Sequence, residues 1–248
     1  MVSRSFMLKS FKSLSLLLLL ITCYAASGET LTFSGYEWTV RDDATPSGPG
    51  PNLWDPHNAW LDEHGWLHLK ISRHGGQWHC AEVYLSENLG FGRYQWEVAG
   101  ALDQFAPQIV LGLFNYTRPE VEPDGTNEID IEYARWGKAS IPVGNYTVYP
   151  AVKTVKSQTH PFDFKLNNPE TTSWFDWSSK GVKFQTMGDK GQVIDQWNCS
   201  PAEPAKYIPQ KPLPLHINLW LCDGKPPQNN LDTEVVIKKF TFTPLPRD

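Results

Sequence analysis

The sequence has few sulfur-containing residues and no concentration of basic ones. Four cysteines and three methionines occur in 248 residues, and 22 Lys and Arg against 27 Asp and Glu give a formal net charge of −5. The Lys and Arg residues are scattered along the chain, which argues against nucleic acid or an anionic membrane as the partner. We therefore expect a partner that is recognised without a basic surface.

The sequence also lacks an apolar run of membrane-spanning length. The longest run, at residues 14–21, is too short for a bilayer, which needs about 20 apolar residues. Basic residues precede it and small residues follow it, as in a secretory signal. We expect residues 1–28 to be removed and residues 29–248 to form a single secreted domain. A lipid anchor through Cys23 is the weaker alternative, because Thr22 fits poorly before a lipidated cysteine.

No window shows a sustained helical period, whereas 20 Pro and 18 Gly punctuate the chain. Alternation of apolar and polar residues predicts strands at 31–40, 66–72, 78–85, 92–99, 109–114, 127–133, 144–149, 172–177, 182–186, 192–197, 215–221 and 234–243. A dozen short strands joined by turns predict an all-β fold, a two-sheet antiparallel β-sandwich. We expect the Pro-rich stretches 42–56 and 200–214 to be irregular loops.

The most informative stretch is the acidic strand at residues 127–133. In an extended strand, Glu128, Asp130 and Glu132 share one face, and the apolar residues between them share the other. Like charges this close repel one another. Such a local conflict is more typical of a functional site than of a neutral surface. The alternative is a solvated acidic strand face.

Paired carboxylates fit glycoside hydrolysis. That reaction needs one carboxylate as nucleophile or base and one carboxylic acid that protonates the leaving oxygen. A third acid between them can hold a shared proton and separate the pKa values of its neighbours. The spacing alone leaves the stereochemistry open.

Several segments read together resemble the family 16 glycoside hydrolases, which are secreted concanavalin A-like β-jelly-roll enzymes that cut β-glucans with retention of configuration. Glu128-Ile-Asp-Ile-Glu132 is similar to the family's catalytic Glu-x-Asp-x-Glu. The other segments that carry the resemblance are Asn58-Ala-Trp60, Gly65-Trp-Leu-His-Leu69, Cys80-Ala-Glu-Val83, Phe91-Gly-Arg-Tyr94, Gly144-Asn-Tyr-Thr-Val-Tyr149, Trp174-Phe-Asp-Trp177, Val182-Lys-Phe184 and His216-Ile-Asn-Leu-Trp220. By this match Glu128 would be the nucleophile, Asp130 the assisting acid and Glu132 the general acid/base.

The unbulged spacing of the acidic motif resembles the lichenase and xyloglucan-active branches. Three positions depart from the family pattern. Thr126 and Asn127 stand where the family often has Trp before the first catalytic Glu, Tyr84 replaces a common Arg, and Ala59 replaces a common Cys. The departures leave the acidic trio intact but affect the expected substrate contacts.

Candidate substrate-binding residues come from two sources. Glu82 alternates with apolar Val83, and His216, Asn218 and Trp220 alternate with apolar neighbours on another strand, so we expect their side chains on the face that carries the carboxylates. Trp220 would stack on a sugar ring, and His216 would bond a sugar hydroxyl or Asp130 or be structural. The family resemblance also places Asn145 in the substrate cleft.

Metal and cysteine chemistry are not expected at the site. The seven His show no ligand-like spacing, so we predict no catalytic metal and no cofactor, although a structural calcium bound by loop oxygens is compatible with the sequence. The three cysteines of the mature chain form an odd set. A Cys199–Cys222 bridge is one pairing, and Cys80 is expected to be a buried free thiol.

The resemblance therefore implies a retaining hydrolase that cleaves internal β-glycosidic bonds of a β-glucan-type polysaccharide, and we expect a monomer. Two alternatives stay open. A transglycosylase would pass the glycosyl unit to another sugar, and a non-catalytic lectin would bind glucan on the same sandwich. The intact acidic trio argues against the lectin. We expect loops 42–56, 117–125, 152–171 and 200–214 to set the specificity.

Overall fold

A computed structural model describes residues 28–117 and 123–245, whose strands stack as two antiparallel sheets. The front sheet contains, in spatial order, β1 (Thr30–Phe33), β2 (Tyr36–Val40), β7 (Gln77–Leu85), β16 (Leu215–Leu221), β9 (Ile109–Tyr116), β10 (Glu128–Ala134), β11 (Gly144–Tyr149) and β12 (Gln158–Phe162). The back sheet contains β5 (Ala59–Leu61), β6 (Leu67–His74), β17 (Thr233–Pro244), β8 (Gly92–Ala99), β13 (Glu170–Ser178), β14 (Gly181–Gly188) and β15 (Val193–Cys199).

The remaining elements are short. β3 (Asp43–Ser47) and β4 (Asn52–Trp54) form a hairpin, and β4 runs parallel to β7. Antiparallel pairing of β6 with β7 links the back sheet to the front sheet. The helical turns are η1 (Pro56–Asn58), η2 (Leu102–Gln104), α1 (Pro204–Tyr207) and η3 (Cys222–Gly224). Within the described residues, none of these helices has the length and apolar character to span a bilayer.

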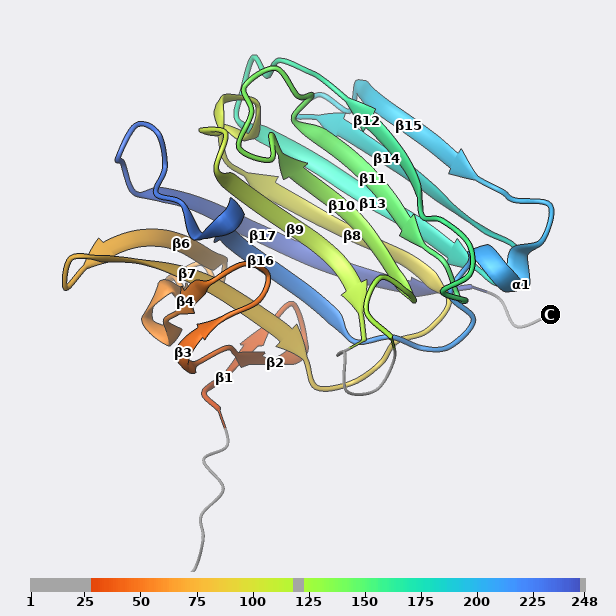
Figure 1. Ribbon diagram of the computed structural model, residues 1–248, viewed down its shortest axis with the longest axis horizontal. Helices are drawn as coiled ribbons and strands as arrows, with labels where there is room; N and C mark the ends of the chain where they lie inside the picture. Colours follow the sequence, from red (N-terminus) through yellow and green to blue (C-terminus); the bar gives the residue numbers. More distant parts are fainter. Residues whose placement is uncertain (1–27, 118–122, 246–248) are drawn as a thin grey trace, which may run out of the picture.

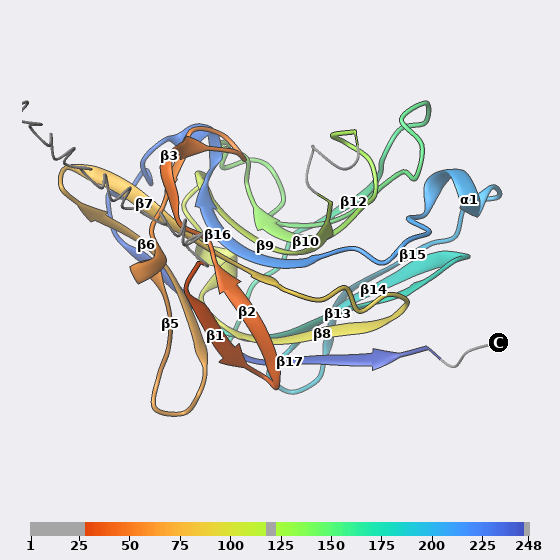
Figure 2. The same ribbon diagram turned by 90° about the horizontal axis from the view of Figure 1, so that it is seen from below.

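The core lies between the two layers, which Figure 2 shows one above the other. Alternation along β8 turns Tyr94, Trp96 and Val98 inward, and each is at most 1% exposed. From the front sheet, Tyr133 on β10 reaches across the core. Its hydroxyl bonds Ser173 Oγ on β13 at 2.6 Å. The alternation therefore fixes which face of β10 is buried and which faces outward.

The predicted all-β sandwich is confirmed, and the predicted strands 92–99, 144–149 and 215–221 have the same bounds as β8, β11 and β16. The single strand predicted at 31–40 is wrong. Ser34 and Gly35 have φ of 53° and 83°, which breaks the segment into the β1–β2 hairpin. Mirror-image turns with two positive φ values match the twist of paired strands, so the hairpin is the favoured outcome.

The predicted irregular loops also contain structure. Loop 42–56 holds the β3–β4 hairpin, loop 200–214 holds α1, and loop 152–171 holds β12. Residues 1–27 of the predicted signal and residues 118–122 of the predicted loop 117–125 lie outside the described residues. The signal and the single mature domain stay predictions.

Candidate active site

The acidic trio lies on β10, in the middle of the front sheet, and β9 and β11 flank it. Ile129, Ile131 and Tyr133 belong to the core and are fully buried. Because side chains alternate along a strand, Glu128, Asp130 and Glu132 extend from the opposite, outer face of the front sheet. This outer face is concave in Figure 2. The structure thus brings the three predicted catalytic residues together on one accessible side of the sandwich.

Burial and mutual repulsion hold protons on the trio. Burial, then the charge of Glu132, raises the pKa of Glu128 to about 8. Burial raises the pKa of Glu132 to about 7. The pKa of Asp130 lies well above its usual range, mainly because the group is buried and further because both glutamates are negatively charged. Close carboxyls titrate as a group, so the trio shares protons at neutral pH.

Hydrogen bonds differentiate the members of the trio. Asp130 and Glu128 share a hydrogen bond that lowers the pKa of Glu128 and raises the pKa of Asp130, so Asp130 donates and Glu128 accepts. A hydrogen bond from Asn145 on β11 lowers the pKa of Glu132 against the larger effect of burial. Asn145 Nδ2 also donates to Thr147 Oγ1 at 2.8 Å. The proton shared by Asp130 and Glu128 can therefore reside on Asp130 and leave Glu128 ionised.

The register of the front sheet aligns further polar side chains with the trio. Glu132 pairs with Gly112 on β9, Gly112 pairs with Asn218 on β16, and Asn218 pairs with Glu82 on β7. A Cβ at Gly112 would lie 2.5 Å from Asn218 Oδ1. The missing side chain at this position therefore lets the Asn218 amide lie over β9 beside Glu132. The predicted candidates Asn218 and Glu82 share one row with a catalytic glutamate.

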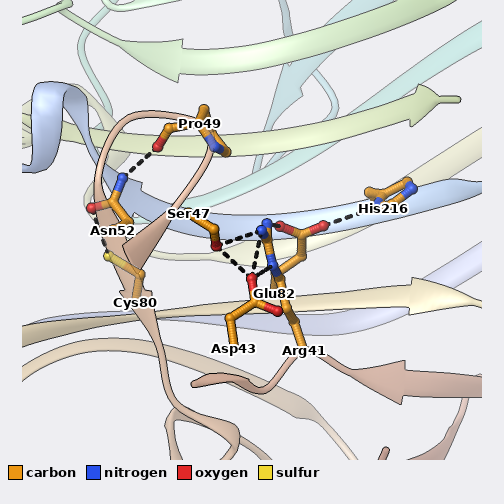
Figure 3. Close-up of polar contacts among 8 residues, drawn as sticks. All are labelled: Arg41, Asp43, Ser47, Pro49, Asn52, Cys80, Glu82 and His216. Carbon is orange, nitrogen blue, oxygen red and sulfur yellow. Dashed lines mark hydrogen bonds and ion pairs between the residues drawn. The ribbon is translucent and has the colours of Figure 1, made fainter. Parts of the chain in front are cut away.

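Glu82 is held between Arg41 and His216 (Figure 3). Arg41 Nη1 donates to Glu82 Oε2 at 2.7 Å, and His216 Nδ1 lies 2.8 Å from Glu82 Oε1. Burial acts to raise the pKa of Glu82, but the bonds and charges of His216 and Arg41 outweigh it and lower this pKa. Glu82 is 5% exposed. With both oxygens engaged, Glu82 is placed to orient His216 rather than to present a free carboxylate.

The β3–β4 hairpin supports this ion pair. Arg41 Nε donates to Asp43 Oδ2 at 2.8 Å, and Arg41 Nη2 donates to Ser47 Oγ at 2.9 Å. The guanidinium also lies over the ring of Trp54, 4.2 Å from its centroid. Figure 3 shows Ser47 and Asp43 converging on Arg41 from the hairpin side. The hairpin that sequence patterns missed thus positions a charge at one side of the site.

Three buried polar atoms on the outer face have no hydrogen-bond partner among the described residues. They are Asp130 Oδ1, His216 Nε2 and Asn218 Oδ1. The predicted contact between His216 and Asp130 is therefore not made, and Phe114 on β9 lies between them in the register and stacks against His216. A buried polar atom without a partner costs about 1–3 kcal/mol, so such atoms in a native protein call for water or a ligand.

The predicted sugar-stacking residue Trp220 lies on the same strand face but is only 8% exposed. Trp136 packs edge-on against it, with ring centroids 6.2 Å apart. Trp136 also has a φ of 49°, which is costly for a bulky side chain and typical of functional positions. Trp136 is more exposed than Trp220 and so offers the more accessible ring at this end of the site.

The cysteines do not contribute to the site. Cys80, Cys199 and Cys222 are free thiols, so the considered Cys199–Cys222 bridge is not formed, and the predicted buried thiol at Cys80 is confirmed. Burial raises the pKa of Cys80 to about 12, and its sulfur donates to Asn52 Oδ1 at 3.3 Å. Cys80 is therefore a structural residue. The structural calcium stays a prediction.

Sequence reasoning missed Arg41, Phe114, Trp136 and Tyr149. Tyr149 pairs with Glu128, and its pKa is raised by burial and then by the acidic trio. Its signal was readable, because Tyr149 alternates with Asn145 on a strand whose bounds were predicted correctly. Arg41 and Trp136 gave no such signal, because each stands just beyond the end of a strand.

No protein-family model matches the chain, and no curated protein matches it in sequence. Solved structures do match. The Bacillus licheniformis β-glucanase has a TM-score of 0.61 and 22% identity, with 83% of this chain and 91% of that chain covered. A Mycobacterium tuberculosis protein named as an immunostimulatory antigen and pseudo β-1,3-glucanase has a TM-score of 0.61 and 19% identity, with 81% and 88% covered.

A Bacteroides ovatus mixed-linkage glucan protein of glycoside hydrolase family 16, in complex with the product G4G4G3G, has a TM-score of 0.61 and 9% identity, with 83% of this chain and 94% of that chain covered. The TM-scores show a shared fold, and at these low identities they show nothing of the activity. The chain has the jelly-roll fold of the family 16 β-glucanases, and the predicted resemblance is confirmed at the level of the fold.

Proposed function

We propose that the protein is a secreted family 16 glycoside hydrolase that cleaves internal bonds of a β-glucan-type polysaccharide with retention of configuration. One observation carries the proposal. Three clustered carboxyls, of which Asp130 is buried and Glu128 and Glu132 are partly buried, share protons on the concave face of a glucanase-like sandwich. They lie beside polar atoms that have no partner among the described residues. A cluster of three acids whose mutual repulsion lowers the stability of the fold is typical of a catalytic site.

The first half of the reaction uses the proton distribution in the trio. Glu128 attacks the anomeric carbon of the sugar, and a covalent glycosyl-enzyme ester forms as the glycosidic bond breaks. Glu132, whose pKa of about 7 keeps it protonated in mildly acidic solution, gives its proton to the departing oxygen. Asp130 holds the shared proton and its hydrogen bond to Glu128 in the fraction of molecules in which Glu128 is ionised, and it is this fraction that attacks.

The second half returns the enzyme to its starting state. Glu132, now ionised, takes a proton from a water molecule as that water attacks the anomeric carbon. The ester bond to Glu128 breaks, and the product carries the original configuration. The Asn145 hydrogen bond favours the ionised form of Glu132 that this step requires.

Substrate contacts follow from the unpaired atoms. Asn218 Oδ1 can accept a hydrogen bond from a sugar hydroxyl. His216 Nε2 can form a hydrogen bond with a second hydroxyl, because Nδ1 of the same ring is already engaged by Glu82. Tyr149, which pairs with Glu128, and Trp136, which follows Ala134, supply aromatic surface near the two ends of β10. The site therefore combines hydroxyl recognition with ring stacking, as polysaccharide sites require.

Two other functions are compatible with the same fold, and the experiment below distinguishes them from hydrolysis. A glucan-binding protein without turnover is favoured by one finding, that a protein of this fold from Mycobacterium tuberculosis is named a pseudo β-1,3-glucanase. A transglycosylase would use the same carboxyls with a sugar in place of water. Product length separates transfer from hydrolysis, because transfer gives chains longer than the substrate.

The experiment is reducing-end release by the mature protein from β-1,3-1,4-glucan, β-1,3-glucan, xyloglucan, agar and carrageenan, with Glu128→Gln beside it. Release from one polymer that disappears in Glu128→Gln supports the hydrolase and identifies the substrate. Binding to a polymer without release, measured by affinity electrophoresis, would replace the hydrolase with a lectin. Products longer than the substrate, seen by mass spectrometry, would replace it with a transglycosylase.

A further inference from the structure

A second cluster of titratable side chains lies away from the acidic trio, where β4 meets the β6–β7 hairpin. Asp55 follows β4, His74 ends β6 and His79 lies on β7. Parallel pairing of β4 with β7 places Trp54 opposite Cys80, and antiparallel pairing places Ser72 opposite His79. Three separate segments thus deliver one carboxylate and two imidazoles to one point.

The three side chains are close enough to share one ion. His74 Nε2 lies 2.7 Å from Asp55 Oδ2, and His79 Nδ1 lies 3.7 Å from the same oxygen. One ligand atom from each residue lies within 4.8 Å of the other two. Ligands of a tetrahedral zinc ion stand about 3.3–3.5 Å apart, given metal–ligand bonds of about 2.0–2.2 Å. The observed spacings, from 2.7 Å up to the 4.8 Å limit, bracket that value, so rotation of the side chains can bring the three ligand atoms to it.

We propose that Asp55, His74 and His79 bind a borderline divalent transition-metal ion, with Zn²⁺ as the expected occupant and water as the fourth ligand. Two imidazoles and one carboxylate are typical ligands of such ions. Ca²⁺ and Mg²⁺ are not expected here, because they take mainly oxygen ligands and the cluster offers one carboxylate.

The carboxylate is already oriented for this role. Asp55 Oδ1 accepts a bond from the backbone nitrogen of His57 at 2.9 Å, and His57 Nδ1 lies 2.9 Å from the same oxygen. These contacts leave Oδ2 facing the two histidines. Hydrogen bonds that fix a ligating carboxylate are a usual feature of metal sites.

The two rings can also adapt. His74 and His79 stack, with centroids 3.6 Å apart and an angle of 15° between their planes. Their side chains are 52% and 17% exposed, so His74 can rotate away from the stack while His79 stays fixed by its surroundings. A shared ion would replace this ring contact with two coordinate bonds.

The ion would connect the β6–β7 hairpin to the segment that carries Trp54. That residue packs on Arg41, which bonds Glu82 on the outer face of the front sheet. Metal binding would therefore stiffen the hairpin at one side of the candidate active site. The metal site stands independently of the proposed activity, because its residues do not contact the trio in any described interaction.

The test uses untagged mature protein depleted of metal and titrated with ZnCl₂ in a calorimeter, with CaCl₂ as a second probe. We expect one equivalent of Zn²⁺ to bind and CaCl₂ to give no heat. A Zn²⁺ concentration about 100-fold above Kd should raise Tm by about 5–10 °C. Co²⁺ should give the visible absorption bands of a tetrahedral site.

Variants assign the ligands. His74→Ala and His79→Ala should each weaken Zn²⁺ binding at least tenfold, and His57→Ala should weaken it by about tenfold through Asp55. His64→Ala, an exposed histidine in another turn, is the matched control and should bind as the wild type does. His74→Ala should keep the metal-free Tm, so its loss of binding would not reflect misfolding. Absence of stoichiometric Zn²⁺ uptake, or uptake unchanged in His74→Ala, would overturn the site.

Discussion

Arg41 Nη1 lies 2.7 Å from Glu82 Oε2, which joins the end of β2 to the outer face of β7 by a buried charge pair. The side chains are 21% and 6% exposed. His216 engages the second oxygen of Glu82. Because Glu82 has little contact with water, its charge depends on these two partners.

We predict that Arg41→Met lowers the free energy of unfolding by about 3–5 kcal/mol, since it leaves a buried carboxylate with one partner. Arg93→Met is the matched control. Arg93 makes two hydrogen bonds to Asp176 and lies over the ring of Trp174, but its side chain is 41% exposed, so its loss should cost less, about 1–2 kcal/mol. Urea denaturation of both variants measures the difference. Equal losses would show that Glu82 does not depend on Arg41.

Gly112→Ala should impair substrate binding. The new Cβ would lie 2.5 Å from Asn218 Oδ1, so the Asn218 amide must move away from Glu132. We expect KM to rise at least tenfold, with a stability loss of about 1–3 kcal/mol from overpacking. Gly100→Ala is the control, because its nearest contacts would be at 3.4 Å. Wild-type kcat/KM in Gly112→Ala would remove Asn218 from the substrate contacts.

The raised pKa values of the trio predict how stability depends on pH. An unfolded Glu has a pKa near 4.3, whereas the folded values are about 8 for Glu128 and about 7 for Glu132. Between about pH 4.5 and pH 8 the unfolded chain loses protons that the folded protein keeps, so these groups lower the free energy of unfolding as pH rises.

Glu132→Gln should therefore exceed the wild type by no more than about 1 kcal/mol at pH 5 and by about 1–3 kcal/mol more at pH 8. Glu37→Gln, at an exposed position of β2, should follow the wild type at both values. Thermal unfolding at pH 5 and pH 8 measures the comparison. A Glu132→Gln variant that tracks the wild type at both pH values would show that Glu132 is not held protonated by burial.

Strict alternation made the fold and the acidic trio predictable from the sequence. Ile129 and Ile131 could face only the core, which left Glu128 and Glu132 on the outer face. The same logic placed Asn218 and His216 correctly, since β16 alternates in the same way. Periodicity of two is a local property, and these assignments required no knowledge of distant contacts.

Features that depend on contacts across the chain were not predictable. Arg41 acquires its role from Glu82, 41 positions later, and Trp220 is covered by Trp136 from another strand end. Asp55 meets His74 and His79 only because β4 pairs in parallel with β7. No local pattern records such pairings, so neither the buried ion pair nor the Asp–His cluster had a sequence signal.

The most direct test of the double-displacement mechanism uses azide with alanine variants and a dinitrophenyl oligosaccharide of the polymer that is cleaved. Glu132→Ala should lose at least about 100-fold in turnover of the polymer. Azide should accelerate its turnover of the activated glycoside and give a β-glycosyl azide, since azide replaces water in the second half. Glu128→Ala should give the α-azide, because azide replaces the nucleophile. Failure of azide to accelerate either variant, with no glycosyl azide formed, would contradict the roles assigned to the two glutamates.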